Sequence, residues 1–223
     1  MFQQYGRILP LLYLIVNDIF HSTISKNDLL ELNWYMDQFF DNLRLIDRKA
    51  FFSLNDFAMQ SHFWRDFFYF FAQYGIVLIA IGVIYLVIRV RINAVFTAVL
   101  SSIISTFVSF IIYLLWQRPR PFITYAGSVD RLIARTTVVS FPSAHTYLSF
   151  AIAITVLLYG HKKLGLAMVV LALMTALSRV AIGVHYPSDV IGGAIIGLLS
   201  GILAYWWMES FEHFWQENSA VNE

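Results

Sequence analysis

The sequence contains no cysteine, and only 13% of its 223 residues are charged. The absence of cysteine excludes disulfide bonds and thiolate metal ligands, and it does not indicate in which cellular compartment the protein lies. The formal net charge of +1 is far from the strongly basic surface of a nucleic-acid-binding protein, so we expect no nucleic acid partner. No cleavable signal peptide is predicted, because no small-residue cleavage site follows the apolar run after Arg7.

Hydrophobic residues, in contrast, make up 59% of the chain, and the mean hydropathy is +0.66. An ordinary soluble domain is only roughly half apolar. A helix needs about 20 apolar residues to cross a bilayer, and five apolar stretches are interpreted as crossings: residues 67–88, 94–116, 141–160, 164–177 and 190–208. The sequence therefore predicts an all-α, polytopic membrane helix bundle with five transmembrane helices. Glycines recur every four residues at 193, 197 and 201, which predicts close packing of the last helix against another.

The first 63 residues have a mixed composition. Residues 8–20 are apolar but interrupted by polar residues and a proline, and they are shorter than a full crossing requires. We expect residues 8–20 to form an interfacial helix, and the alternative is that they form a sixth transmembrane helix. Residues 28–60 combine aromatic and charged side chains, a pattern typical of an amphipathic helix on the membrane surface or of a helix that caps the bundle. The predicted organisation is an N-terminal amphipathic part (1–63), a transmembrane catalytic domain (64–208) and a C-terminal tail (209–223).

Counting the predicted crossings assigns each connecting segment to one side of the membrane. The basic turns at 89–91 and 161–163 fall on one side, and the polar segments 118–120, 143–145 and 179–189 all fall on the other. If the arginines of the polar segments are set aside as functional, the positive-inside rule places the two basic turns in the cytoplasm. We therefore expect a multi-pass protein of the cell (inner) membrane whose polar segments meet on the periplasmic or extracellular side.

The segment from 178 to 189 carries Arg179, His185 and Asp189 between two apolar runs. Charged groups beside a bilayer are costly and usually mark function. His185 and Asp189 are four positions apart, so one helical turn would bring the carboxylate to the imidazole, where it would fix the tautomer and support positive charge. Arg179 adds a forked donor suited to phosphate. This segment predicts a reactive histidine beside an anion site.

Two further segments contribute candidate residues. Ser143 follows a proline and precedes an apolar run, so it is either a simple N-cap residue or part of an anion site at the helix N-terminus. His145, in the same turn, would reach a leaving group; the alternative is a satisfied interfacial histidine. Arg118 and Arg120 are separated by prolines that stiffen the backbone, and either arginine would bind phosphate or extend to lipid headgroups.

The motifs Arg120-Pro121, Pro142-Ser143-Ala144-His145, and Ser178-Arg179 followed by His185 and Asp189 resemble the three signatures of the type 2 phosphatidic acid phosphatase (PAP2) superfamily. The resemblance covers roughly residues 64–208. The chain departs from the family at two positions. Tyr113 stands where the family has a lysine, seven positions before the arginine, and Ala144 stands where it has a glycine, which retains the backbone N–H.

The resemblance implies a phosphatase that uses a phosphohistidine intermediate and needs no metal or other cofactor. His185 would be the nucleophile, and Asp189 would orient it and stabilise its cation. His145 would protonate the departing oxygen and then activate water. The phosphoryl oxygens would be held by Arg120, Arg179, Ser143 and the backbone of Ala144, with Arg118 as a replacement for the missing lysine.

The implied substrate is a lipid phosphate or diphosphate: undecaprenyl diphosphate, phosphatidylglycerol phosphate, phosphatidate or a lipid A phosphate. The compact core and the Arg-Pro-Arg-Pro-Phe run are slightly more similar to bacterial polyprenyl-diphosphate phosphatases. Transfer of phosphate to an acceptor other than water is a related alternative. A metal-binding transporter using His145, His185 and Asp189 is a different class, disfavoured because the arginines would repel a cation. A hydrolase with Ser143 as nucleophile lacks the nucleophile-elbow pattern and gives the arginines no role.

Overall fold

The computed structural model describes residues 26–129, 132 and 137–220. Within these residues the chain is helical and forms no strand, apart from one isolated bridge between Pro119 and Val139. The all-α prediction is therefore confirmed for this part of the chain. The predicted interfacial helix at 8–20 lies outside the described residues. The helices are α2 (Lys26–Met59), α3 (His62–Ile88), α4 (Ile92–Leu115), α5 (Pro121–Thr124), α6 (Ala144–Leu158), α7 (Lys162–Ala181) and α8 (Pro187–Ala220).

The chain divides into two compact units, Met1–Ile46 and Asp47–Glu223. The expected organisation into parts 1–63, 64–208 and 209–223 stays a prediction. In the first unit, α2 exposes large apolar side chains such as Trp34, Tyr35 and Phe39, and a position of this part on the membrane surface stays a prediction. In the second unit, the remainder of α2 packs as a capping helix. Its side chain Phe51 is fully buried, and Asn55 Nδ2 donates to the carbonyl oxygen of Ala181 at 2.7 Å.

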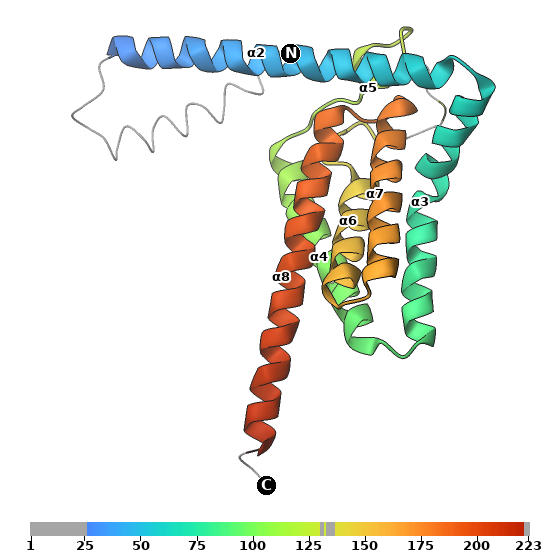
Figure 1. The fold of residues 1–223 in the computed structure, drawn as a ribbon. Coiled ribbons are helices and arrows are strands. Elements are labelled where there is room, and N and C mark those ends of the chain that lie inside the picture. Colours follow the sequence, from blue (N-terminus) through green and yellow to red (C-terminus); the bar gives the residue numbers. More distant parts are fainter. Residues whose placement is uncertain (1–25, 130–131, 133–136, 221–223) are drawn as a thin grey trace. The chain divides into compact units, whose positions relative to one another are not determined.

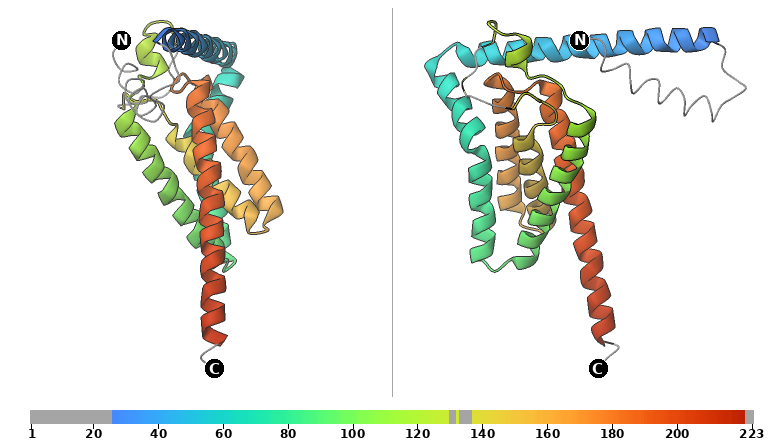
Figure 2. Two further views of the ribbon diagram at one scale, coloured as in Figure 1. Left: turned by 90° about the vertical axis from the view of Figure 1, so that its left-hand side faces the viewer. Right: turned by 180° about the vertical axis from the view of Figure 1, so that it is seen from behind.

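The second unit is a helix bundle with α6 in contact with α3, α4, α7 and α8 (Figures 1 and 2). A central helix must present small side chains on several faces, and the buried residues of α6 include Thr146, Ser149, Ala151 and Ala153. Four helices, α3, α4, α7 and α8, are long and apolar enough to cross a membrane. The remaining predicted crossing, residues 141–160, contains α6, which is apolar but only 15 residues long, roughly 22 Å at 1.5 Å per residue. Residues 141–143 precede the helix in an irregular segment.

The glycines of α8 allow it to approach α6 closely, which confirms the packing predicted for them. A Cβ atom added at Gly193 would lie 3.0 Å from the carbonyl oxygen of Ser143, and one at Gly197 would lie 2.8 Å from Cβ of Phe150. Separations this short leave no room for a side chain. The close approach sets the first turn of α8 beside the start of α6, where the Ser143 N–H donates to the carbonyl oxygen of Asp189 at 3.2 Å.

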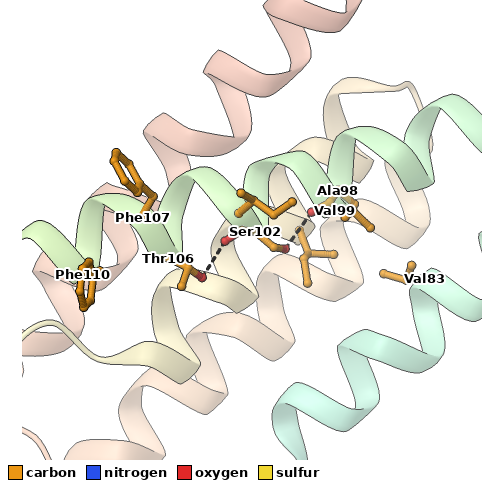
Figure 3. A pocket seen from close by; sticks show the side chains of 9 residues that line it. Val83, Ala98, Val99, Ser102, Thr106, Phe107 and Phe110 are labelled. Carbon is orange, nitrogen blue, oxygen red and sulfur yellow. Dashed lines mark hydrogen bonds between the residues drawn. The ribbon is translucent and has the colours of Figure 1, made fainter.

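Most hydroxyl groups of α4 donate to carbonyl groups of their own helix. Ser102 Oγ donates to the Ala98 carbonyl at 2.8 Å and Thr106 Oγ1 to the Ser102 carbonyl at 2.7 Å (Figure 3). Internal bonding of this kind is what an apolar surrounding demands. These residues line an apolar groove of about 590 Å³ between α3, α4 and α6, which includes none of the candidate site residues. Thr97 Oγ1 also lies 2.8 Å from the Tyr159 hydroxyl at the end of α6, which joins the two helices.

The two ends of the bundle differ as the crossing count predicted. The turn between α3 and α4 and the turn between α6 and α7 lie at one end, whereas α5 and the connection between α7 and α8 lie at the other (Figure 1). The polar segments therefore do meet at one end of the bundle. Residues 209–220 of the expected C-terminal tail continue α8. Neither glycine nor proline follows Gly201 to interrupt the helix, and Glu212 is bonded to Asn93 Nδ2 at 2.8 Å.

Candidate active site

The turn after α7 places His185. Gly183 has a φ of +81°, a conformation that costs a side-chain-bearing residue roughly 1–2 kcal/mol. Its N–H donates to the Val180 carbonyl at 2.9 Å, and the Val184 N–H donates to the Arg179 carbonyl at 3.3 Å. This is the Schellman pattern that glycine at the helix end permits. As a result the chain reverses at once, and His185 follows with only 3% of its surface exposed.

The start of α8 places Asp189. Pro187 occupies the first helical position, which suits its fixed φ and missing N–H, and Asp189 Oδ2 accepts the Tyr186 N–H at 2.8 Å in the manner of a capping box. His185 therefore precedes the helix, and the expectation that it shares a helical turn with Asp189 is wrong. The two side chains still meet, with His185 Nδ1 3.6 Å from Asp189 Oδ2.

The contacts of the His185 ring identify its protonation state. Arg120 Nη1 lies 3.1 Å from His185 Nε2, and a guanidinium can only donate, so Nε2 is the acceptor and the ring proton is on Nδ1. Burial lowers the pKa of His185 from 6.5 to about 4; the bond to Asp189 opposes this shift, and the charges of Arg179 and Arg120 add to it. At neutral pH the ring is therefore neutral, with the Nε2 lone pair directed at a guanidinium.

Ser140 belongs to the site although the sequence did not indicate it. The residue is 1% exposed; its hydroxyl donates to Asp189 Oδ2, and its Oγ lies 3.4 Å from His185 Nδ1. Because its only proton is given to Asp189, Ser140 Oγ faces His185 as an acceptor. The hydroxyl thus stands between the imidazole and the carboxylate. A serine in a loop has no distinguishing signal in a single sequence, since its role depends on two residues more than 40 positions away.

Arg120 and Arg179 are both buried near His185, and their predicted role in phosphate binding stays a prediction. Arg120 is fixed by the loop before α6: its Nε donates to the Thr137 carbonyl at 2.9 Å, and its Nη1 donates to the Val184 carbonyl at 2.9 Å. Arg179, 1% exposed, donates from Nη1 to the Ala72 carbonyl of α3 at 3.1 Å. Two buried guanidinium groups beside a neutral imidazole provide an electrostatic setting for an anion.

Ser143, Ala144 and His145 form the start of α6 at the same end of the bundle. Ser143 is the N-cap residue, but its side chain makes no capping bond to the described residues; its Oγ instead accepts the Thr146 hydroxyl at 3.0 Å. Simple capping by the side chain is therefore excluded, and the Ser143 proton is available for another acceptor. Ala144 is exposed and His145 is half-buried in the first helical turn.

Comparison with known proteins agrees with these motifs. Residues 94–212, just over half of the chain, match the PAP2 superfamily. The chain belongs to this superfamily. A relative from Bacillus licheniformis, named bacitracin transport permease protein BcrC, is 36% identical over 160 residues, which cover 70% of this chain and 78% of that protein. Undecaprenyl-diphosphatase BcrC of Bacillus subtilis is 35% identical over 106 residues, which cover 48% of this chain and 53% of that protein.

Two solved structures share the fold of this chain. LpxE of Aquifex aeolicus is 28% identical, with a TM-score of 0.61, and the match covers 70% of this chain and 92% of that one. A PAP2 type phosphatidylglycerolphosphate phosphatase of Bacillus subtilis is 20% identical, with a TM-score of 0.60 over 94% of this chain and 98% of that one; this likeness concerns the fold alone. The chain is thus a multi-pass membrane phosphatase of the PAP2 superfamily.

The position of the PAP2 lysine is not occupied by a positive charge. Tyr113 stands there on α4 with 43% of its surface exposed. Arg118, predicted as its replacement, is directed at two carboxylates: Nη2 lies 2.6 Å from Asp47 Oδ2, and Nη1 lies 2.9 Å from Asp189 Oδ1. The geometry therefore does not favour Arg118 as a phosphate ligand.

Proposed function

We propose that this PAP2 protein removes phosphate from a lipid phosphate or diphosphate through a phosphohistidine formed on His185. The observation that supports the proposal is the arrangement of the His185 ring. Its Nε2 lone pair lies 3.1 Å from the Arg120 guanidinium, and its Nδ1 side faces Ser140 and Asp189. An unprotonated nitrogen beside a phosphate-binding group, with a carboxylate behind the ring, is what nucleophilic attack by imidazole requires.

In the first step, His185 Nε2 attacks phosphorus while the bond between phosphorus and the lipid oxygen breaks. His145 donates a proton to the departing oxygen. Arg120 moves its donor from Nε2 to a phosphoryl oxygen, and Arg179, the Ser143 hydroxyl and the Ala144 N–H bind the remaining oxygens and stabilise their negative charge. The imidazole becomes positively charged as the N–P bond forms, and Asp189 stabilises that charge through Nδ1.

In the second step, water attacks phosphorus and the bond between phosphorus and Nε2 breaks. His145, which has lost its proton, removes one from the attacking water. Inorganic phosphate leaves, and both histidines return to their starting protonation states. The two rings need opposite states at the start of the cycle, and the low pKa of His185, about 4, supplies the neutral one.

We further propose that the substrate is a polyprenyl diphosphate, with phospholipid phosphates as the next candidates. The support is the similarity to the Bacillus subtilis protein named undecaprenyl-diphosphatase. A site at one end of a bundle of apolar helices suits a lipid whose hydrocarbon chain stays in the bilayer. The basic turns lie at the opposite end from the site, so we place the site on the outer face of the cell (inner) membrane.

Phosphate release by the purified protein from a panel of lipids tests the proposal. The panel contains undecaprenyl diphosphate, phosphatidylglycerol phosphate, phosphatidate and a lipid A phosphate, each assayed with and without chelator. We expect release from the polyprenyl diphosphate that persists with chelator and is lost in His185→Ala. His161→Ala is the matched control, because His161 lies in the turn at the other end of the bundle and its loss should leave the rate unchanged.

Retained activity in His185→Ala would remove the nucleophile assignment. A rapid quench with radiolabelled substrate should also trap labelled protein that is acid-labile and alkali-stable, as a phosphohistidine is. A metal-binding transporter is not supported, since the chain belongs to the PAP2 superfamily and its relatives include proteins named as phosphatases. Labelled phosphate appearing on an added alcohol in place of water would indicate the related phosphotransferase.

A further inference from the structure

A polar cluster joins α2 to the catalytic end of the bundle. Asp47 of α2 lies outside residues 94–212 that match the superfamily. Its Oδ1 accepts the Ser188 N–H at 2.8 Å, and its Oδ2 accepts the Ser188 hydroxyl at 2.7 Å and Arg118 Nη2 at 2.6 Å. Asp47 therefore binds both the first turn of α8 and the guanidinium that contacts Asp189.

The Arg118 guanidinium is held on several sides. Nη1 donates to Asp189 Oδ1 at 2.9 Å and to the Ser188 hydroxyl at 2.6 Å, and the guanidinium carbon lies 3.8 Å from the centre of the Tyr186 ring. Such a planar fork stacked on an aromatic ring is fixed in direction as well as position. Its side chain is 18% exposed, compared with 10% for Asp47 and none for Asp189, so solvent screens these charges weakly.

The two carboxylate oxygens of Asp189 consequently bind different groups. Oδ1 is bound by Arg118, whereas Oδ2 accepts the Tyr186 N–H and the Ser140 hydroxyl and faces His185 Nδ1. A carboxylate bound on one oxygen by a fixed guanidinium cannot rotate, so the other oxygen stays directed at the imidazole. Without Asp47, Arg118 would lose one of its two anionic partners and would be free to turn with Asp189.

We propose that Asp47 and Arg118 are positioning residues that fix the orientation of Asp189 and thereby of His185. In this role α2 supplies part of the catalytic apparatus from outside the family-matched segment. Arg118 contributes to the rate through Asp189 and not by binding the phosphate of the substrate. The inference rests on the proposed function, in which His185 attacks phosphorus and Asp189 orients it.

The test is a double-mutant cycle on the full-length protein with undecaprenyl diphosphate as substrate. Asp47→Ala should lower kcat by about 10- to 100-fold with KM changed by less than about 2-fold, as expected for loss of a charge-assisted hydrogen bond. In the Asp189→Asn background, the same substitution should change kcat by less than about 2-fold, because the residue through which it acts is already impaired. Asp47→Asn, which keeps the shape of the side chain, is measured in parallel in case the alanine variant does not fold.

Asp41→Ala is the matched control: Asp41 lies on the same helix, and its ion pair with Arg44 at 3.3 Å is exposed. Its loss should leave kcat unchanged. Equal effects of Asp47→Ala in both backgrounds, or a rise in KM with kcat unchanged, would overturn the positioning role. If His185→Ala and Asp189→Asn are both fully active, the proposed function itself fails; if they are impaired and Asp47→Ala and Asp47→Asn are not, only this inference fails.

Discussion

Replacing Ser140 by alanine tests whether His185 and Asp189 interact directly or through the Ser140 hydroxyl that lies between them. In the wild-type protein Ser140 Oγ donates to Asp189 Oδ2 and lies 3.4 Å from His185 Nδ1, closer than the 3.6 Å between Nδ1 and Oδ2. Ser140→Ala removes one hydrogen bond to a charged group, worth about 1.5–3 kcal/mol. The substitution also removes the acceptor that faces His185 Nδ1. The bond from Nδ1–H to that acceptor becomes charge-assisted as the imidazole becomes positive, so its loss lowers kcat by about 10- to 100-fold.

The assay is initial phosphate release at saturating lipid, with the rate of phosphoenzyme formation measured by rapid quench. Ser149→Ala is the matched control, because Ser149 is also buried and its Oγ has no hydrogen-bond partner among the described residues. We expect the Ser149 variant to keep the wild-type rate and Ser140→Ala to form phosphoenzyme slowly with KM nearly unchanged. A Ser140→Ala rate within about 2-fold of wild type would refute the bridging role.

Two further predictions concern stability. Gly197→Ala should lower the free energy of unfolding by about 1–3 kcal/mol, since the added Cβ would lie 2.8 Å from Cβ of Phe150. Thermal unfolding in detergent measures this change, with substitution of the exposed Leu199 by alanine as the control. An unchanged unfolding transition in Gly197→Ala would contradict the close packing. The pKa of His185 is about 4 in the folded protein, compared with an ordinary value of 6.5. Between pH 6.5 and pH 4 the unfolded chain therefore binds a proton on this histidine that the folded protein does not bind. The free energy of unfolding consequently falls as the pH drops through this range, by up to about 3 kcal/mol. His185→Asn should lack this component, and the same pH dependence in both proteins would show that His185 does not cause it.

Much of the site's local structure could be foreseen from neighbouring residues. The positions of Gly183 and Pro187 predict where α7 ends and α8 begins, because a positive φ and a missing N–H are properties of those residues themselves. The apolar stretches likewise predict which segments cross the membrane and therefore which polar segments share a side. The predicted meeting of Arg120, Arg179 and His185 follows from that count together with the motifs.

The length of α6 and the division into compact units were harder to predict from the sequence. Apolar residues from 141 onward suggest a full crossing, but Pro142 and Ser143 lie before the helix, which begins at Ala144. The expected boundary at residue 63 follows a change in composition. Residues from Asp47 onward belong to the same compact unit as the bundle, where Asn55 bonds to the Ala181 carbonyl, and such a contact depends on the partner as well as on the helix.

What the sequence predicted by itself was the helical class, the meeting of the polar segments at one end of the bundle and a candidate nucleophile, His185, because these predictions rest on hydropathy and on short motifs of residues close together in the chain. Only the tertiary structure decided the direction of each polar side chain. Arg118 carries the same charge whether it faces phosphate or carboxylate, and Asp47 reaches Ser188 across 141 positions of sequence. Such pairings depend on helix packing, which brings distant groups within hydrogen-bond distance and leaves no trace in the local pattern.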